Sequence, residues 1–98
     1  MSLSASQRRY LRGLAHPLKP VIQLGTKGLT EAVIKELTLA LDQHELIKVR
    51  LEAMDHPQRD KQIAHLLEQS NSQLVQRIGH IACLFRRNIE QPRIALPR

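Results

Sequence analysis

The spacing of apolar residues switches between the period of a helix and that of a strand along this chain. Two short apolar stretches, VIQL at 21–24 and LIKVRLE at 46–52, each lie between segments with helical spacing. In the second stretch apolar and charged residues alternate, so one face meets the core and the other, with Lys48 and Arg50, meets water. Strands that alternate with helices favour parallel neighbours in one sheet, and the pattern therefore predicts an α/β fold.

Three segments have the spacing and the capping residues of helices. They run from Ser4 or Ser6 to the prolines at 17 and 20, from Thr30 to His44, and from 55 to 71. The first helix is expected to turn an apolar stripe inward and its arginines largely outward. That stripe consists of Leu3, Tyr10, Leu11, Leu14 and Ala15.

The C-terminal part predicts a hairpin followed by an extended tail. Two apolar runs, QLVQRI at 73–78 and IACLFRR at 81–87, flank the turn residues Gly79 and His80. The order is then αβαβαββ, in a two-layer fold with a small four-stranded mixed sheet. At 98 residues we expect one domain covering residues 1–98.

Positive charge is concentrated toward the two ends of the chain. The net charge is +6, residues 1–30 hold five bases and no acid, and residues 76–98 hold five bases and one acid. The segment 31–75 has five bases and eight acids. If the fold brings the ends together, they form one basic face, which is the electrostatic footprint of a polyanion-binding protein. Charge alone leaves the kind of acidic partner open.

The composition argues against a membrane protein. The chain is 42% apolar and 24% charged, which is typical of a soluble globular protein. No apolar stretch is long enough for a membrane span, and the N-terminus lacks the apolar core of a signal peptide. We therefore expect a cytoplasmic protein with no membrane partner.

The sequence also lacks the motifs of the common catalytic and metal sites. The five histidines do not pair with each other or with cysteine at the close spacing of metal ligands. There is no nucleophile elbow, dinucleotide fingerprint or convincing acid–base pair. The single Cys83, in the apolar run HIACLF, is expected to be a buried thiol. We expect no catalytic residues, no metal, no cofactor and no enzymatic activity.

Two glycines three residues apart, Gly25 and Gly28, stand where the first strand meets the second helix, with Thr26 and Lys27 between them. Backbone N–H groups and the positive end of the helix dipole favour phosphate at such a junction. Glycine lets a sugar–phosphate backbone approach the main chain closely, and Lys27 adds a charge. This is the logic of the GxxG loop of KH-type modules, whereas the Walker spacing is absent. A sharp turn that needs glycine for its geometry only is the alternative interpretation.

Four motifs occur together in this chain: YLRGLAHPLKPVIQLGTKGLTEAVI, HELIKVRL, VQRIGHIACLFRR and the closing IALPR. In this combination the chain resembles the CRM domain family (chloroplast RNA splicing and ribosome maturation), in particular its stand-alone bacterial members of the YhbY type. The similarity runs from about Arg8 to the C-terminus. It implies a fold like the C-terminal domain of translation initiation factor three, RNA binding without catalysis, and association with precursors of the large (50S) ribosomal subunit.

By this resemblance the GxxG glycines are Gly25 and Gly28, and the family's IKV strand is 47–49. The basic first helix supplies Arg8, Arg9 and Arg12. Many family members have lysine directly after the first glycine, where this chain has Thr26, so the phosphate contact can shift to the next residue or to backbone N–H groups. Phe85 stands where members often have tyrosine, which removes a polar contact and leaves base stacking available.

The first hypothesis is an RNA-binding factor, with rRNA of the large-subunit precursor as the partner and ribosome assembly as the process. The expected RNA-binding residues are Gly25, Thr26, Lys27, Gly28, Arg8, Arg9, Arg12, Lys19, Arg86 and Arg87. With only two aromatic residues, affinity should come mainly from phosphate contacts and RNA shape. The alternative is a protein-interaction module that docks on an acidic partner through the same basic face. DNA binding is a third hypothesis, without a helix-turn-helix or zinc signature. A monomer is the expected state.

Overall fold

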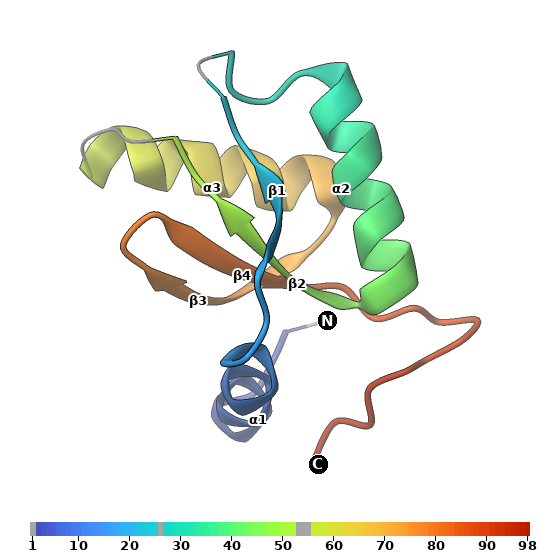
Figure 1. The fold of residues 1–98 in the computed structure, drawn as a ribbon. Helices are drawn as coiled ribbons and strands as arrows, with labels where there is room; N and C mark the ends of the chain where they lie inside the picture. Colours follow the sequence, from blue (N-terminus) through green and yellow to red (C-terminus); the bar gives the residue numbers. More distant parts are fainter. Residues whose placement is uncertain (1, 26, 53–55) are drawn as a thin grey trace.

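The computed structural model describes residues 2–25, 27–52 and 56–98, the side chain at position 56 excepted. Its elements are α1 (Ala5–Ala15), β1 (Pro20–Gln23), α2 (Glu31–His44), β2 (Leu46–Arg50), α3 (His56–Ser70), β3 (Gln73–Ile78) and β4 (Ile81–Phe85). Figure 1 shows them in space. The predicted order αβαβαββ and the α/β class with a four-stranded mixed sheet are confirmed.

The caps that begin α1 and α2 are local features of the sequence. The Ser4 hydroxyl accepts a hydrogen bond of 3.2 Å from the backbone N–H of Gln7, and the Gln7 side chain accepts one from the N–H of Ser4, which completes a capping box. Thr30 caps α2 by accepting a hydrogen bond of 3.2 Å from the N–H of Val33. These bonds fix where both helices start.

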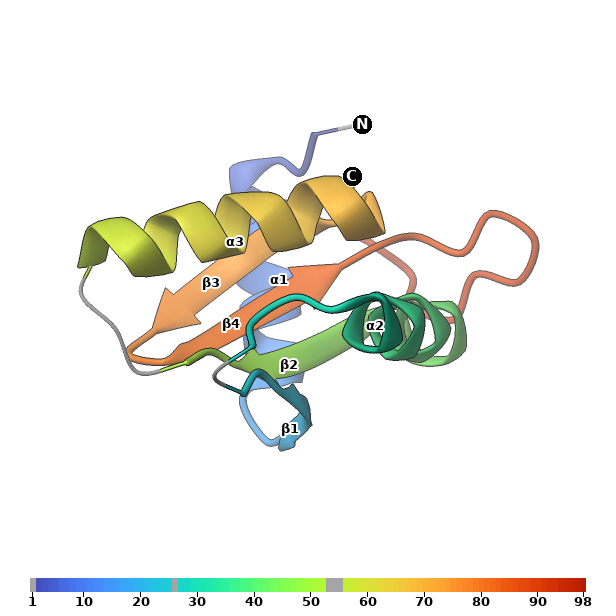
Figure 2. The same cartoon turned by 90° about the horizontal axis from the view of Figure 1, so that it is seen from above.

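The strands lie in the order β1-β2-β4-β3. β1 pairs with β2 in parallel, joined by α2 as the crossover, and the other two pairings are antiparallel. The turn Gly79-His80 joins β3 to β4, with Gly79 at a φ of 57°. β1 is therefore an edge strand, and the turn that leaves it opens at one corner of the sheet (Figure 2).

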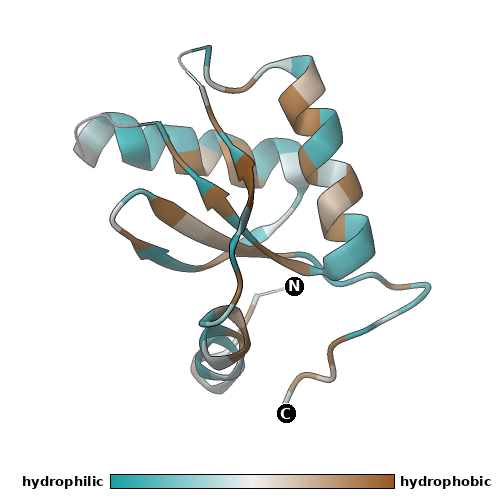
Figure 3. Ribbon diagram, in the orientation of Figure 1, coloured by the Kyte–Doolittle hydropathy of each residue, from teal (hydrophilic) through white to brown (hydrophobic). Residues whose placement is uncertain are grey.

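The sheet has a hydrophobic core on each face. The first core packs α2 and α3 on the sheet and includes Leu37, Leu41, Ile47, Leu66 and Leu84. The second packs α1 on the other face and includes Leu3, Leu11, Leu46, Cys83 and Phe85. Figure 3 shows the apolar residues gathered on the strands and on the inward sides of the helices. In the structure α1 thus forms an additional layer, on the face of the sheet opposite α2 and α3, beyond the two layers expected from the sequence.

The inward stripe predicted for α1 is narrower than expected. Leu3, Leu11 and Ala15 are buried, whereas Tyr10 and Leu14 stay partly exposed. The prediction was wrong for these two residues because, in the part of the chain that the structure describes, α1 is the only helix on its face of the sheet and its flanks have no helical neighbour.

The segment after β4 returns to α1. Ile94 and Leu96 pack on the second core, and the Gln7 side chain donates a hydrogen bond of 3.0 Å to the carbonyl oxygen of Pro97. The C-terminus therefore lies near α1, as Figure 1 shows. The turn between β1 and α2 lies at the opposite side of the sheet in that view.

Candidate nucleic-acid interface

A tight turn joins β1 to α2 at the two glycines. The backbone N–H of Gly28 donates to the carbonyl oxygen of Gly25 over 2.9 Å, which closes a four-residue turn. Lys27 is exposed in this turn, and Thr26 lies outside the described residues. Glu31 in the first turn of α2 already offsets part of the positive helix end, so the helix dipole adds less there than the sequence suggests.

The two glycines have different structural requirements. Gly28 has a φ of +65°, and a Cβ there would lie 3.6 Å from Nε2 of Gln62, so backbone geometry alone explains this glycine. Gly25 has no positive φ, and a Cβ there would meet nothing within 4 Å. The interpretation that the turn needs glycine only for geometry therefore accounts for Gly28 and leaves Gly25 unexplained.

One side of the turn opens onto the end of β2. Gly25 shares a cavity of about 340 Å³ with Gln23, Arg50 and His80. Arg50 is exposed and forms no ion pair with another described residue. Glu52 also lines this cavity and is half-buried, with its backbone N–H bound to Gln62. The open side of Gly25 thus adjoins the side chain of Arg50, and Glu52 lines the same cavity.

The other side of the turn lies close to α3. Lys61 and His65, one helical turn apart, line a cavity of about 270 Å³ with Leu29 and Gln62. The Gln62 side chain connects the two sides, because its Oε1 accepts the Glu52 N–H while its Nε2 lies near Gly28. The turn thus has a cation on either side of it.

Positive charge continues from the turn along β2 toward α1. Lys48 and Arg50 lie two residues apart on the face of the sheet that carries α1. The Lys48 ammonium donates a hydrogen bond of 3.3 Å to the carbonyl oxygen of His16, just beyond α1, and Arg12 lines the same small cavity as Lys48. We call Arg50, Lys48 and Arg12 the cationic strip.

Two of the arginines expected to bind RNA have partners in the fold. Arg86 donates from Nη1 to the carbonyl oxygen of Ser70 over 3.0 Å and from Nη2 to that of Thr38 over 3.2 Å, and it pairs with Asp42. Its guanidinium ties the ends of α2 and α3 together, so we leave it out of the interface. Arg8 donates to the carbonyl oxygen of Leu74 in β3, which fixes it beside the sheet.

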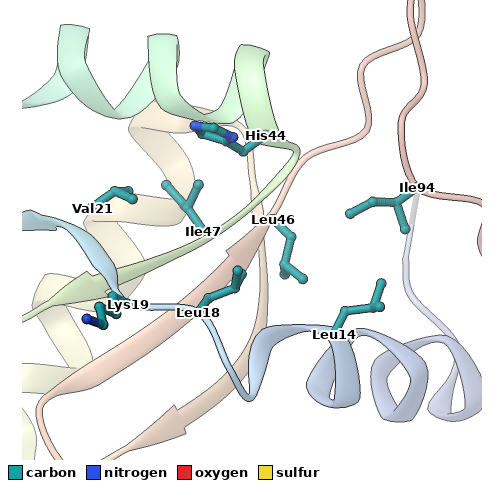
Figure 4. Close-up of a pocket in the computed structure, with 8 residues that line it drawn as sticks. All are labelled: Leu14, Leu18, Lys19, Val21, His44, Leu46, Ile47 and Ile94. Carbon is teal, nitrogen blue, oxygen red and sulfur yellow. The ribbon is translucent and has the colours of Figure 1, made fainter.

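Lys19 and Arg87 lie away from the turn. Lys19 stands at the rim of an apolar groove of about 510 Å³ between α1 and β1, lined by aliphatic side chains such as Leu14, Leu18 and Leu46 (Figure 4). Arg87 lines a separate cavity with Asn71 and Ile89. Arg9 is exposed on α1.

The direction of the strands separates the C-terminal arginines from the glycine turn. Phe85 pairs with Leu46 at the start of β2, whereas the turn lies beside Arg50 at its end. Arg86 and Arg87 follow Phe85 and so lie at the opposite end of the sheet. The two ends of the chain therefore do not form one basic face around the turn, and the cations beside it come from β2 and α3 instead.

Other kinds of site find little support in the described residues. Within residues 2–25, 27–52 and 57–98, no group of three or more histidine, cysteine or acidic side chains could hold a metal ion. No helix in those ranges is long and apolar enough to cross a membrane. Cys83 is buried as expected; burial raises the pKa of its thiol, and the charge of Lys48 lowers it by less.

The comparisons with known proteins agree with this architecture. The family model of the CRS1/YhbY (CRM) domain matches residues 3–86. The chain belongs to the CRM domain family. This family binds RNA without catalysing a reaction, so the expectation of a non-enzymatic protein is confirmed by membership.

Relatives of this CRM domain occur in distant bacteria. The chain is 43% identical over 97 residues to the "RNA-binding protein" of Haemophilus influenzae, covering 99% of this chain and 97% of that one. It is 37% identical over 95 residues to "Probable RNA-binding protein YqeI" of Bacillus subtilis, with 97% and 99% covered. The solution structure of SAV1595 from Staphylococcus aureus matches with a TM-score of 0.83 at 36% identity, covering 98% of this chain and 100% of that one.

The sequence did not predict several of the residues that lie beside the turn at Gly25 to Gly28. The sequence did indicate that Lys48 and Arg50 occupy outward positions of a strand. Nothing in it placed them near Gly25. Lys61 and His65 are four residues apart on a helix and so share one of its faces. Only the packing of α3 shows that this face lies beside the turn. His80 belongs to a hairpin turn that sheet pairing brings next to β2.

Proposed function

We propose that this CRM domain binds RNA by holding the sugar–phosphate backbone against the turn at Gly25 to Gly28, with Lys27, Arg50 and Lys61 supplying positive charge. The partner is rRNA of the large-subunit precursor, and the process is ribosome assembly. The relatives named RNA-binding proteins in Haemophilus influenzae and Bacillus subtilis support the RNA part. The ribosomal part rests on the family resemblance in the motifs quoted above.

Gly25 is the observation that carries the proposal. It is exposed, its backbone conformation does not require glycine, and a side chain would have open space. A glycine there has no purpose in the fold that the described residues reveal, whereas bare main chain beside Arg50 fits a phosphate group. Backbone contacts of this kind carry little sequence information, so weak sequence discrimination is expected.

The substitution Gly25→Asp tests the turn. Its carboxylate would occupy the space of the phosphate and repel it, so RNA affinity should fall at least about tenfold, the effect of roughly 1.4 kcal/mol, with an unchanged thermal midpoint. Fluorescence anisotropy with a labelled single-stranded RNA of about 12 nucleotides measures the affinity. Ile89→Asp makes the same charge change at a position 87% exposed at the far end of the sheet and should bind like the wild type. Wild-type affinity in Gly25→Asp would remove the turn from the mechanism.

The ribosomal partner is tested in lysates. The wild-type protein should sediment in a sucrose gradient with precursors of the large subunit, and Gly25→Asp should remain near the top. Sedimentation of both proteins away from ribosomal particles would contradict the assembly role while leaving RNA binding open.

Docking on an acidic protein would use the same cations as RNA binding. Nuclease treatment of the purified protein distinguishes these two hypotheses. Protein purified at low salt should carry nucleic acid, seen as a raised ratio of absorbance at 260 to 280 nm. Ribonuclease should remove that absorbance and deoxyribonuclease should not. Absence of nucleic acid together with a copurifying acidic protein would favour the alternative.

A further inference from the structure

We propose that a small cavity between α1 and the β3–β4 hairpin binds one nucleobase of the RNA, an inference that rests on the proposed function. The cavity has a volume of about 170 Å³. Its floor is the buried Ala15 and Cys83, and Ile78 and Ile81 line it as well. Gln76 is among its polar residues.

The size and the lining fit a single heterocycle. Pockets for drug-sized ligands have volumes of roughly 300–1,000 Å³, so a site of this size takes one planar ring system or a fragment like it. A base has two apolar faces and a polar edge, and unstacked bases in single-stranded RNA are commonly bound by stacking together with hydrogen bonds to that edge. Here aliphatic side chains can cover one apolar face of a base, and one amide can bind its polar edge.

Ile78 is an exposed apolar residue that the fold does not explain. It is 64% exposed at the end of β3, where it pairs with Ile81 across the hairpin, and it belongs to neither hydrophobic core. A base placed on Ile78 would remove apolar surface from water on both partners. The Gln76 amide makes no hydrogen bond within the part of the chain that the structure describes, so it is available to donate to and accept from a base edge.

Charge favours a nucleic acid over an apolar peptide as the occupant. Lys48 and Arg12 line the cavity, and among the described residues no acidic side chain does. Arg50 pairs with Ile81 across the sheet and also shares a cavity with Gly25. The cationic strip thus joins the base site to the glycine turn along one face of β2, so one RNA strand can place phosphates on the strip and a base in the cavity.

The test compares two polyanions with equal charge. One is an oligoadenylate of about 12 nucleotides, and the other is a chain of the same length built from abasic tetrahydrofuran phosphates. The wild-type protein should bind the oligoadenylate about fivefold more tightly than the abasic chain, because one base in the cavity removes apolar surface from water. Ile78→Ser should bind both chains alike, with the affinity of the wild type for the abasic chain.

Two controls separate this inference from the proposed function. Ile89→Ser makes the same chemical change at another exposed isoleucine and should keep the wild-type preference. Gly25→Asp should lose affinity for both chains, and if it does not, the proposed function fails. Equal binding of both chains by the wild type, or an equal loss for both in Ile78→Ser, would overturn the base site while the turn mechanism stands.

Discussion

The carboxylate of Glu45 accepts a hydrogen bond of 2.8 Å from the backbone N–H of Ile94, although 49 residues separate them. The same carboxylate accepts from the N–H of Arg93 over 2.6 Å and from that of Asn88 over 2.7 Å. Glu45 is fully buried and has a φ of 63°, where α2 ends. One acidic residue therefore caps a helix and holds the C-terminal segment on the second core.

Glu45→Ala should destabilise the protein by about 3 kcal/mol, because three backbone N–H groups lose a charged acceptor. Urea denaturation measures this. The released segment should also be cut by trypsin after Arg87 and Arg93 faster than in the wild type. Glu90→Ala, at an exposed acid of the same segment, is the control and should change neither result. A tail that stays protected in Glu45→Ala would show that the apolar contacts of Ile94 suffice.

The two glycines of the turn should respond differently to alanine. Gly28→Ala forces a side chain into the left-handed region and should cost about 1–2 kcal/mol of stability. Gly25→Ala should leave stability unchanged or raise it slightly, because alanine restricts the unfolded chain and meets open space in the folded one. Thermal denaturation of both variants decides this, and equal losses would mean that Gly25 also serves the fold.

The neighbouring residues Arg86 and Arg87 should differ in how much they contribute to stability. Arg86→Ala removes the donor to the Ser70 carbonyl oxygen at the end of α3, a second donor to the Thr38 carbonyl oxygen and the ion pair with Asp42, so it should cost about 2 kcal/mol. Arg86→Lys should rescue little, because an ammonium cannot reproduce the planar fork. Arg87→Ala is the matched control, since Arg87 is exposed, and should be neutral in urea denaturation. Full rescue by lysine would point to charge rather than geometry.

RNA binding should weaken with salt in proportion to the phosphates neutralised. If Lys27, Arg50, Lys61, Lys48 and Arg12 each meet one phosphate, the plot of log affinity against log salt should have a slope of about −3.5 for single-stranded RNA. Arg50→Ala should reduce its magnitude by about 0.7, and Arg87→Ala should leave it unchanged. Anisotropy titrations at several salt concentrations measure the slope. A flat salt response would contradict the electrostatic mechanism.

The single thiol offers a test of burial and of pH dependence. Burial raises the pKa of Cys83 above its ordinary value, so the native protein keeps this proton to a higher pH than the unfolded chain does. As pH rises, the thiol therefore loses its proton in the unfolded chain before it does so in the native protein. The contribution of the buried thiol to stability is fully present below the ordinary thiol pKa, and it is lost as pH rises through the raised pKa of the native protein. Cys83 should react slowly with a disulfide reagent in the native protein and fast in guanidinium. Cys83→Ser should reduce the loss of stability at high pH, and an unchanged profile would contradict this.

Local features of the sequence were sufficient for much of the fold. The Ser4 and Thr30 caps, the alternation in 46–52 and the turn at Gly79 each act within a few residues, and each predicted its element correctly. The position of Gly25 and Gly28 between a strand and a helix was predictable for the same reason. The motifs also predicted membership of the CRM domain family, and the match of the family model over residues 3–86 confirms it.

Only the tertiary structure decided which charges stand beside the turn. Strand order places β2 next to β1 and puts Arg50 by Gly25, while the direction of β4 takes Arg86 to the other end of the sheet. Charge counted along the chain could not show this, because sheet pairing joins residues that are distant in sequence and sends neighbours to opposite faces. The sequence alone therefore determined the elements and the glycine turn, and the packing of the sheet decided the surroundings of that turn.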